Sequence, residues 1–168
     1  MTQRRDGTEG YALSAGNAID VLDMGGDELR VLVGAHIEQS RGTVSIIAGV
    51  MHGGGPPLHV HDDEDEVVIV VHGELAYQLG ERRGTLGVGG LLWMPRGVPH
   101  TIASASSEPC RFVTLATPGG LEDLFKVQSE YFASLAPGAA PDPIAMVALP
   151  GAARRRVIGP PLELSNPA

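Results

Sequence analysis

Residues 53–73 read GGGPPLHVHDDEDEVVIVVHG, and this stretch decides the fold expected for the chain. It holds His59 and His61 with one residue between them, and Glu66 follows shortly after. Side chains of an extended strand repeat with period two, so both imidazoles point to the same face. Two imidazoles and a carboxylate that converge on one face are three ligands for a transition metal. The stretch therefore predicts most of a metal site.

Most of the remaining chain has the pattern of short β-strands joined by turns. Glycine and proline are frequent, with 23 and 13 residues, which favours many short strands over long helices. The expected strands cover residues 18–24, 29–35, 43–50, 58–61, 67–71, 74–79, 85–88, 91–94, 101–105 and 111–117. Residues 121–135 have helical spacing, and Asp142 could cap a second short helix that begins at Pro143. The order predicts an all-β antiparallel barrel or double sheet with a C-terminal helical appendix.

The 168 residues are most simply one domain. We divide the chain into an N-terminal arm (residues 1–16), a barrel (17–118) and a C-terminal helical segment with a tail (119–168). The basic cluster in the tail, residues 154–156, is assigned to solvated surface and given no function. Residues 29–33 are apolar at nearly every position, which is typical of a strand covered on both faces. Together with the arm, this strand predicts a homodimer.

Composition narrows the possible partners and surroundings. The net charge of −8 argues against a nucleic-acid partner, because phosphate binding needs a basic surface. Cys110 is the only cysteine, so an intrachain disulfide is impossible. The N-terminus lacks the pattern of a signal peptide, and no uncharged run approaches the roughly 20 apolar residues of a membrane span. We therefore expect a cytoplasmic protein without a membrane partner.

A second ordered stretch, residues 89–100, reads GGLLWMPRGVPH and ends in His100. Its Pro95, Gly97 and Pro99 predict a tight turn that fixes the approach of the chain. A rigid turn that delivers a histidine can place a metal ligand from a distant strand. His100 is therefore the candidate fourth ligand.

The two stretches resemble a known pair of motifs. The spacing of glycine, histidines, glutamate and glycine in residues 53–73 resembles the first motif of the cupin superfamily, and residues 89–100 resemble the second. Ser104 stands where the second motif usually continues to an asparagine. Over residues 28–162 the chain is similar to small single-domain cupins related to quercetin dioxygenases, and small cupins that cyclise polyketides resemble it too.

The resemblance implies a jelly-roll β-barrel with one divalent transition metal per chain inside it. The metal would be bound by His59, His61, Glu66 and His100. Three imidazoles and a carboxylate suit Fe²⁺, which is our first choice, or Zn²⁺, Mn²⁺, Ni²⁺, Co²⁺ or Cu²⁺, and do not suit Mg²⁺ or Ca²⁺. Four protein ligands on an octahedral metal leave two positions for substrate or O₂.

Three functions stay open on the sequence. The first is a dioxygenase that acts on a small aromatic, phenolic or polyketide-like molecule, with Glu66 as metal ligand and catalytic general base. The second is a non-redox, zinc-type polyketide cyclase or isomerase. The third is a non-catalytic domain that binds a small molecule.

Four further residues are weaker candidates for contact with the substrate. His52 is expected near the mouth of the cup, while Trp93 and Tyr77 could line the cavity or pack the barrel. Glu64 shares the strand parity of Glu66 and could instead support the ligands from behind.

Overall fold

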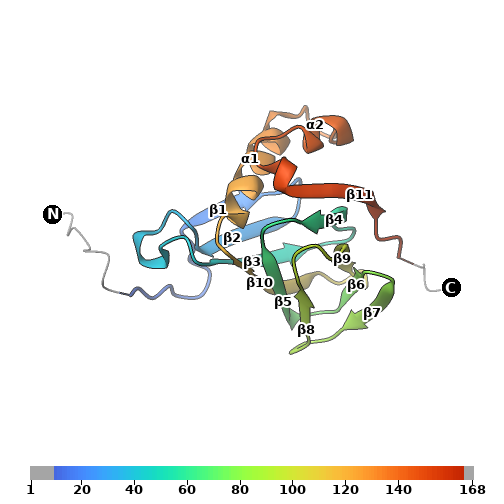
Figure 1. Ribbon diagram of the computed structural model, residues 1–168. Helices are drawn as coiled ribbons and strands as arrows, with labels where there is room; N and C mark the ends of the chain where they lie inside the picture. The colour runs from blue at the N-terminus through green and yellow to red at the C-terminus, as the bar shows by residue number, and fades with distance from the viewer. Residues whose placement is uncertain (1–9, 165–168) are drawn as a thin grey trace.

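Alternating buried and exposed positions along the strands build two antiparallel β-sheets, and the computed structural model describes residues 10–164 (Figure 1). The first sheet has six strands in the order β1-β2-β3-β10-β5-β8. Their bounds are β1 Asp20–Asp23, β2 Glu28–Val33, β3 Ser45–Met51, β10 Cys110–Thr117, β5 Asp65–His72 and β8 Leu91–Met94. The predicted all-β architecture is confirmed.

The second sheet has five strands in the order β11-β4-β9-β6-β7. Their bounds are β11 Arg155–Pro161, β4 Pro57–His61, β9 His100–Ser104, β6 Leu75–Leu79 and β7 Arg82–Leu86. From β3 to β10 the chain passes repeatedly from one sheet to the other, as in a jelly roll. Among residues 10–164 no strand pairing joins the two sheets, so the predicted barrel is open at its edges.

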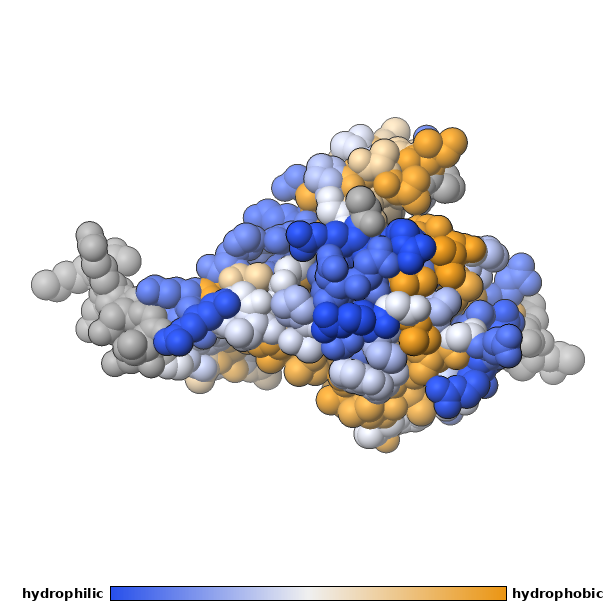
Figure 2. Space-filling view, in the orientation of Figure 1, coloured by the Kyte–Doolittle hydropathy of each residue, from blue (hydrophilic) through white to orange (hydrophobic). Residues whose placement is uncertain are grey.

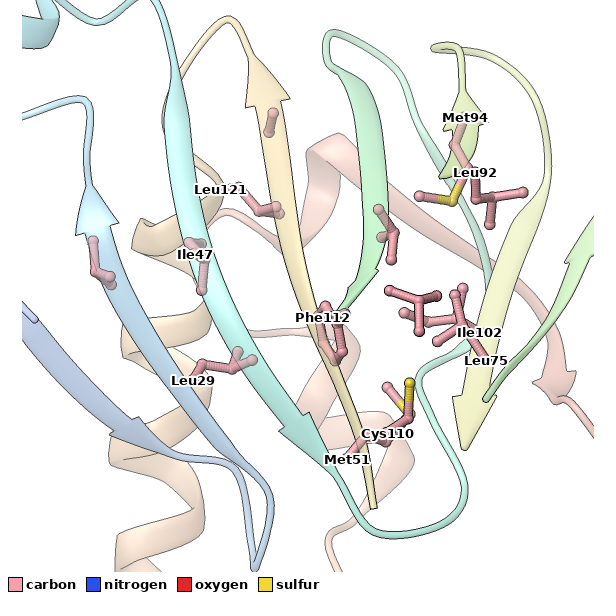
Figure 3. Close-up of a cluster of buried hydrophobic side chains, with 14 of the residues drawn as sticks. Leu29, Ile47, Met51, Leu75, Leu92, Met94, Ile102, Cys110, Phe112 and Leu121 are labelled. Carbon is pink, nitrogen blue, oxygen red and sulfur yellow. The ribbon is translucent and has the colours of Figure 1, made fainter. Parts of the chain in front are cut away.

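The hydrophobic core lies between the two sheets (Figure 3). Ile47 and Phe112 come from the first sheet, and Leu75 and Ile102 come from the second. Cys110 belongs to this core and is fully buried, which raises the pKa of its thiol. The single cysteine is thus a small apolar packing residue.

The corner between β5 and β6 depends on Gly73. Its φ of 73° lies in the left-handed region, which only glycine enters at little cost. A Cβ at this position would lie 2.7 Å from the carbonyl oxygen of Pro109. The corner brings the chain from the first sheet to the second directly after the strand that carries Glu66.

Two α-helices follow the strands, as predicted. α1 Leu121–Ser134 packs against the first sheet through Leu121 and Leu124. The buried carboxylate of Glu122 accepts hydrogen bonds from the Ala35 amide and the Ser45 hydroxyl, and so fastens the helix to the sheet. α2 Pro143–Val147 begins after Asp142, whose carboxylate accepts from the Ile144 amide at 2.9 Å. None of the described helices combines the length and apolar character that crossing a membrane requires.

Three local predictions need correction or extension. β7 begins at Arg82 and not at residue 85, because Leu79 pairs with Arg82 and leaves a two-residue turn. The 3₁₀-helices η1 Glu38–Ser40 and η2 Ala152–Arg154 were not expected. β11 was missed because its prolines argue against a strand. It lies at a sheet edge and pairs only with β4, which is where proline is tolerated.

The domain division remains a prediction, with two observations beside it. β11 adds part of residues 119–168 to the same sheet as β4. In the arm, residues 1–9 lie outside the described part of the chain. The Tyr11 hydroxyl donates to the Leu32 carbonyl at 2.5 Å, and the Gly16 carbonyl accepts from Arg30 Nη1 at 2.5 Å. The described end of the arm therefore runs along β2.

Candidate metal centre

Three strands from both sheets bring the four predicted ligands together. β4 carries His59 and His61, β9 begins with His100, and β5 carries Glu66. His59 pairs directly with His100 across the β4–β9 ladder. His61, His100 and Glu66 are buried, whereas His59 is partly exposed. Solvent therefore reaches the cluster most readily at His59.

The nitrogen atoms of the three histidines converge. His59 Nε2 lies 3.1 Å from His61 Nε2, and one ligand atom from each of the three rings lies within 4.8 Å of the others. Glu66 Oε2 lies 3.7 Å from His61 Nε2 and also 3.7 Å from His100 Nε2. Four donors of the kind that bind transition metals thus face one small volume.

Hydrogen bonds on the far side of two rings direct their lone pairs toward the same point. His59 Nδ1 lies 2.7 Å from the Pro57 carbonyl oxygen, and His100 Nδ1 lies 2.9 Å from that of Val98. A carbonyl can only accept, so each Nδ1 carries the proton and donates it. Each Nε2 is then left with a free lone pair, as metal-binding imidazoles require.

Glu64 takes the corresponding position behind the third ring. Its Oε2 lies 3.3 Å from His61 Nδ1, and its Oε1 accepts from Arg155 Nη2 at 2.5 Å. Burial raises the pKa of the Glu64 carboxyl, but the His61 contact and the Arg155 charge outweigh burial and lower it overall. An ionised Glu64 at this distance favours the tautomer in which His61 Nδ1 carries the proton, and His61 Nε2 would then face the cluster as an acceptor.

The donor set fits a transition metal. His100 Nε2 is buried and has no hydrogen-bond partner among residues 10–164. A buried polar atom without a partner is costly, and a metal ion at the centre of the cluster would satisfy it. The residues that would hold the metal are His59, His61, His100 and Glu66.

The two oxygens of the Glu66 carboxylate have different neighbours, which together keep this group ionised. Oε1 accepts from the Thr114 hydroxyl at 2.6 Å, while Oε2 faces the histidines. Burial raises the pKa of the Glu66 carboxyl, but the His100 and His61 rings and the Thr114 hydroxyl lower it to about 2. The carboxylate is therefore ionised near neutral pH, as a ligand must be.

His59 is neutral for a related reason. Burial and, to a smaller extent, the neighbouring rings of His100 and His61 together lower its pKa to about 4. A neutral imidazole has the lone pair that a metal needs. His59 is therefore ready to bind a metal at neutral pH.

The turn before β9 fixes the approach of His100. The Gly97 amide donates to the His61 carbonyl at 2.8 Å, and Gly97 has a φ of 79°. Arg96 binds Asp65 through its backbone amide and through two guanidinium nitrogens, at 2.8–3.0 Å. The rigid turn predicted from the sequence thus joins the strands of His61, Glu66 and His100.

The weaker candidates for substrate contact lie in different places. Tyr77 packs against the hydrophobic core. It lies on β6 opposite Ile102 of β9, two residues along that strand from His100. Trp93 is 48% exposed and pairs with Val67, so it lies on the opposite face of the first sheet from Glu66. His52 is exposed and binds Asp27 at the end of β3, far along the sheet from Glu66.

Glu64, the fourth weaker candidate, touches His61 and lies behind the ligands. The structure thus brings Glu64 to the cluster and leaves Trp93 and His52 away from it, and a role of these residues in substrate binding stays a prediction. Ser104, in the place of the usual asparagine, is buried and donates to the Glu108 carbonyl at 2.8 Å.

Sequence reasoning missed two residues of the site. Thr114 lies on the inward face of β10, and the alternation of Phe112, Thr114 and Ala116 could have revealed a hydroxyl among apolar neighbours. Arg155 carried no such signal, because the cluster of residues 154–156 was assigned to solvated surface. That assignment is wrong for Arg155, which is 7% exposed because it pairs with the buried Glu64.

Two facing antiparallel sheets with a histidine cluster between them define a double-sheet β-domain with a candidate metal centre. Residues 46–116 match the Cupin domain family. The matched residues hold all four candidate ligands, His59, His61, Glu66 and His100. No curated protein matches the sequence significantly.

Solved structures agree with the fold. KdgF from Halomonas sp. is 17% identical over 69% of this chain and 99% of its own, with a TM-score of 0.57. An RmlC-like cupin from Shewanella frigidimarina is 17% identical over 68% of this chain and 96% of its own, with a TM-score of 0.54. Oxalate decarboxylase from Bacillus subtilis is 18% identical over 68% of this chain and 32% of its own, also with a TM-score of 0.54. At these identities the likeness shows the fold alone.

Proposed function

We propose that this chain is a metal-dependent dioxygenase that acts on a small aromatic, phenolic or polyketide-like molecule. The observation that carries the proposal is the convergence of nitrogen atoms from three histidines, with the Glu66 carboxylate 3.7 Å from two of them. Four such ligands on a six-coordinate metal leave two positions for substrate and O₂. When bound, the metal would supply Lewis acidity and, with a redox metal such as Fe²⁺, the ability to activate O₂.

The surroundings of the cluster support a small apolar substrate. Met94 pairs with Glu66, Leu79 pairs with His100, and both belong to or pack against the hydrophobic core. Apolar walls with a few polar groups are typical of sites for small organic molecules. A flat aromatic or enolic molecule would fit such walls through its apolar faces.

Glu66 would act as the general base. Its carboxylate is ionised, and the Thr114 hydroxyl that holds it can turn to the Val67 carbonyl, 3.0 Å away. A hydroxyl has one proton to donate, so turning away from Glu66 would make this carboxylate more basic. Glu66 would then take the proton of the substrate hydroxyl, and both oxygen atoms of O₂ would enter the product as a C–C bond breaks.

The experiment begins with metal content and oxygen uptake. We expect about one divalent metal per chain after native purification, and O₂ consumption with some member of a panel of flavonols and phenolic polyketides. The His59→Ala/His61→Ala double variant should lose both. His72→Ala is the matched control, because His72 is exposed at the end of β5. Wild-type protein that takes up no metal would contradict the proposal.

A non-redox reaction is the second candidate, and the same four donors favour it. Three imidazoles and a carboxylate can close a tetrahedral zinc site, from which Glu66 would have to loosen before a substrate bound. Turnover without O₂ would favour a zinc-type cyclase or isomerase. Binding of a ligand without turnover in any metal form would favour a non-catalytic binding domain.

A further inference from the structure

The last strand of the chain reaches the metal centre from behind. Arg155, the first residue of β11, pairs with His61 in the β11–β4 ladder. Its guanidinium donates to Glu64 Oε1 at 2.5 Å, and the other oxygen of Glu64 lies 3.3 Å from His61 Nδ1. An unbroken series of contacts thus joins the C-terminal strand to a candidate metal ligand.

The whole basic cluster faces the acidic loop between β4 and β5. Arg154 lies 3.8 Å from Asp63, and Arg156 binds Asp62 at 2.8 Å. The Asp62 amide also donates to the Arg154 carbonyl at 3.0 Å. Hydrophilic surface gathers in Figure 2 where β11 begins over β4. Two of the three ion pairs are exposed, and only the Arg155–Glu64 pair is buried.

The Arg155–Glu64 pair is more deeply buried than the other two ion pairs of the cluster. The side chains of Arg155 and Glu64 are 6% and 4% exposed. Removing two charges from water costs more than an apolar pair of similar volume would, so a buried ion pair is a poor device for stability alone. Glu64 Oε2 and His61 Nδ1 lie 3.3 Å apart, and neither atom has a hydrogen-bond partner among the described residues. The geometry therefore directs the pair toward the ring of His61.

We propose that Arg155 and Glu64 are positioning residues of the metal centre, with Arg155 holding the carboxylate that fixes the orientation and tautomer of His61. This inference rests on the proposed metal site. Glu64 accepts the Nδ1 proton of His61, and Arg155 keeps Glu64 in place from the opposite side. The C-terminal strand thereby completes a site whose ligands all lie between residues 59 and 100.

The test uses the full chain and Co²⁺ as the probe, with affinity measured by chelator competition and geometry by the visible absorption of the bound ion. The main variant is Glu64→Met/Arg155→Met, which removes both buried charges together. We expect its affinity for Co²⁺ to fall about 10- to 100-fold and its absorption bands to change, as when the partner of a metal-bound histidine is lost. The single variant Arg155→Lys keeps Glu64 and a positive charge beside it, so it should lose less affinity for Co²⁺ than the double variant does.

The matched control is Asp62→Asn/Arg156→Met, which breaks the exposed pair on the same loop and strand. It should keep the wild-type affinity and spectrum. A folded Glu64→Met/Arg155→Met variant with wild-type Co²⁺ binding overturns the inference. Equal weakening in both double variants also overturns it, because general docking of β11 would then be the cause. Wild-type protein that binds no Co²⁺ would instead overturn the metal site itself.

Discussion

At the scale of single residues, Glu66 differs from the other candidate ligands. Nδ1 of His59 and of His100 lies against a backbone carbonyl, and Nδ1 of His61 lies 3.3 Å from Glu64, so each Nε2 faces the cluster. Glu66 has one oxygen toward the histidines and the other on the Thr114 hydroxyl. The carboxylate can therefore bind a metal through one oxygen while the hydroxyl tunes its basicity.

Replacement of Thr114 by valine tests this role. Valine keeps the shape but removes the donor, so the buried carboxylate loses a hydrogen bond, and we expect destabilisation of about 1–3 kcal/mol. Urea unfolding of the metal-free protein measures the change. The exposed Thr85→Val is the control and should change the free energy of unfolding little. Wild-type stability and wild-type turnover in Thr114→Val would show that the hydroxyl is dispensable.

Acid should destabilise the metal-free protein. The pKa of His59 is lowered to about 4 in the folded chain, while the ordinary value is 6.5. Between these values the unfolded chain binds a proton that the folded chain does not, so stability falls as the pH falls from 6.5 to 4. Glu66, with a pKa of about 2, acts in the same direction below pH 4.5.

Unfolding in urea with a chelator, at a series of pH values from 7 to 4, measures this dependence. His59→Ala should flatten the slope between pH 6.5 and 4 by about 1–3 kcal/mol in total. His72→Ala, on the exposed end of β5, should keep the wild-type slope. Identical slopes in all three proteins would contradict the buried, neutral state of His59.

At the scale of elements, the site depends on how the chain passes between the sheets. β4 and β9 belong to one sheet and β5 belongs to the other, so His59, His61 and His100 meet Glu66 only when the sheets face each other. The corner at Gly73 and the turn at Gly97 are two of the points where this passage is fixed. Changes at these glycines should act on the site through the fold.

Gly73→Ala should be destabilising. The alanine Cβ would lie 2.7 Å from the Pro109 carbonyl oxygen, and the φ of 73° disfavours an L-residue. We expect a loss of at least about 1–3 kcal/mol, measured by thermal and urea unfolding. Gly87→Ala is the control, because nothing lies within 4 Å of its added Cβ. An unchanged midpoint for Gly73→Ala would show that the corner adapts.

At the scale of the whole molecule, the outer face of the first sheet is apolar. Ile46, Leu115, Val67 and Trp93 form one row across β3, β10, β5 and β8. Leu91 continues the next row, and Leu91 and Trp93 are 56% and 48% exposed. Apolar surface also gathers on the lower side of the molecule in Figure 2, around β8. A face of this kind is the natural surface for the predicted homodimer.

Trp93→Asp should therefore convert a dimer into a monomer, because a charge would be buried in the apolar interface. Light scattering should give twice the 17.5 kDa chain mass for the wild type and the single mass for the variant. Ile144→Asp on α2, which is 77% exposed, is the control and should leave the mass unchanged. A wild-type mass of one chain at micromolar concentration would contradict the dimer.

The sequence alone determined the features that depend on local spacing. The five consecutive β-branched residues at 67–71 predicted the core of β5, and apolar steps of three and four predicted α1. Period two placed His59 and His61 on one face, and the turn with Pro95 and Gly97 pointed to His100. These patterns are visible without tertiary contacts because backbone geometry imposes them.

Only the tertiary structure decided which distant groups meet. Arg155 looked like solvated surface because the carboxylate that buries it, Glu64, lies 91 positions away in the chain. The sequence left open whether Trp93 lines the cavity or packs the barrel, and the register with Val67 places it on the outer face of the first sheet. The packing of the two sheets decides which distant residues pair and which side of each sheet is covered. No local period in the sequence encodes that packing.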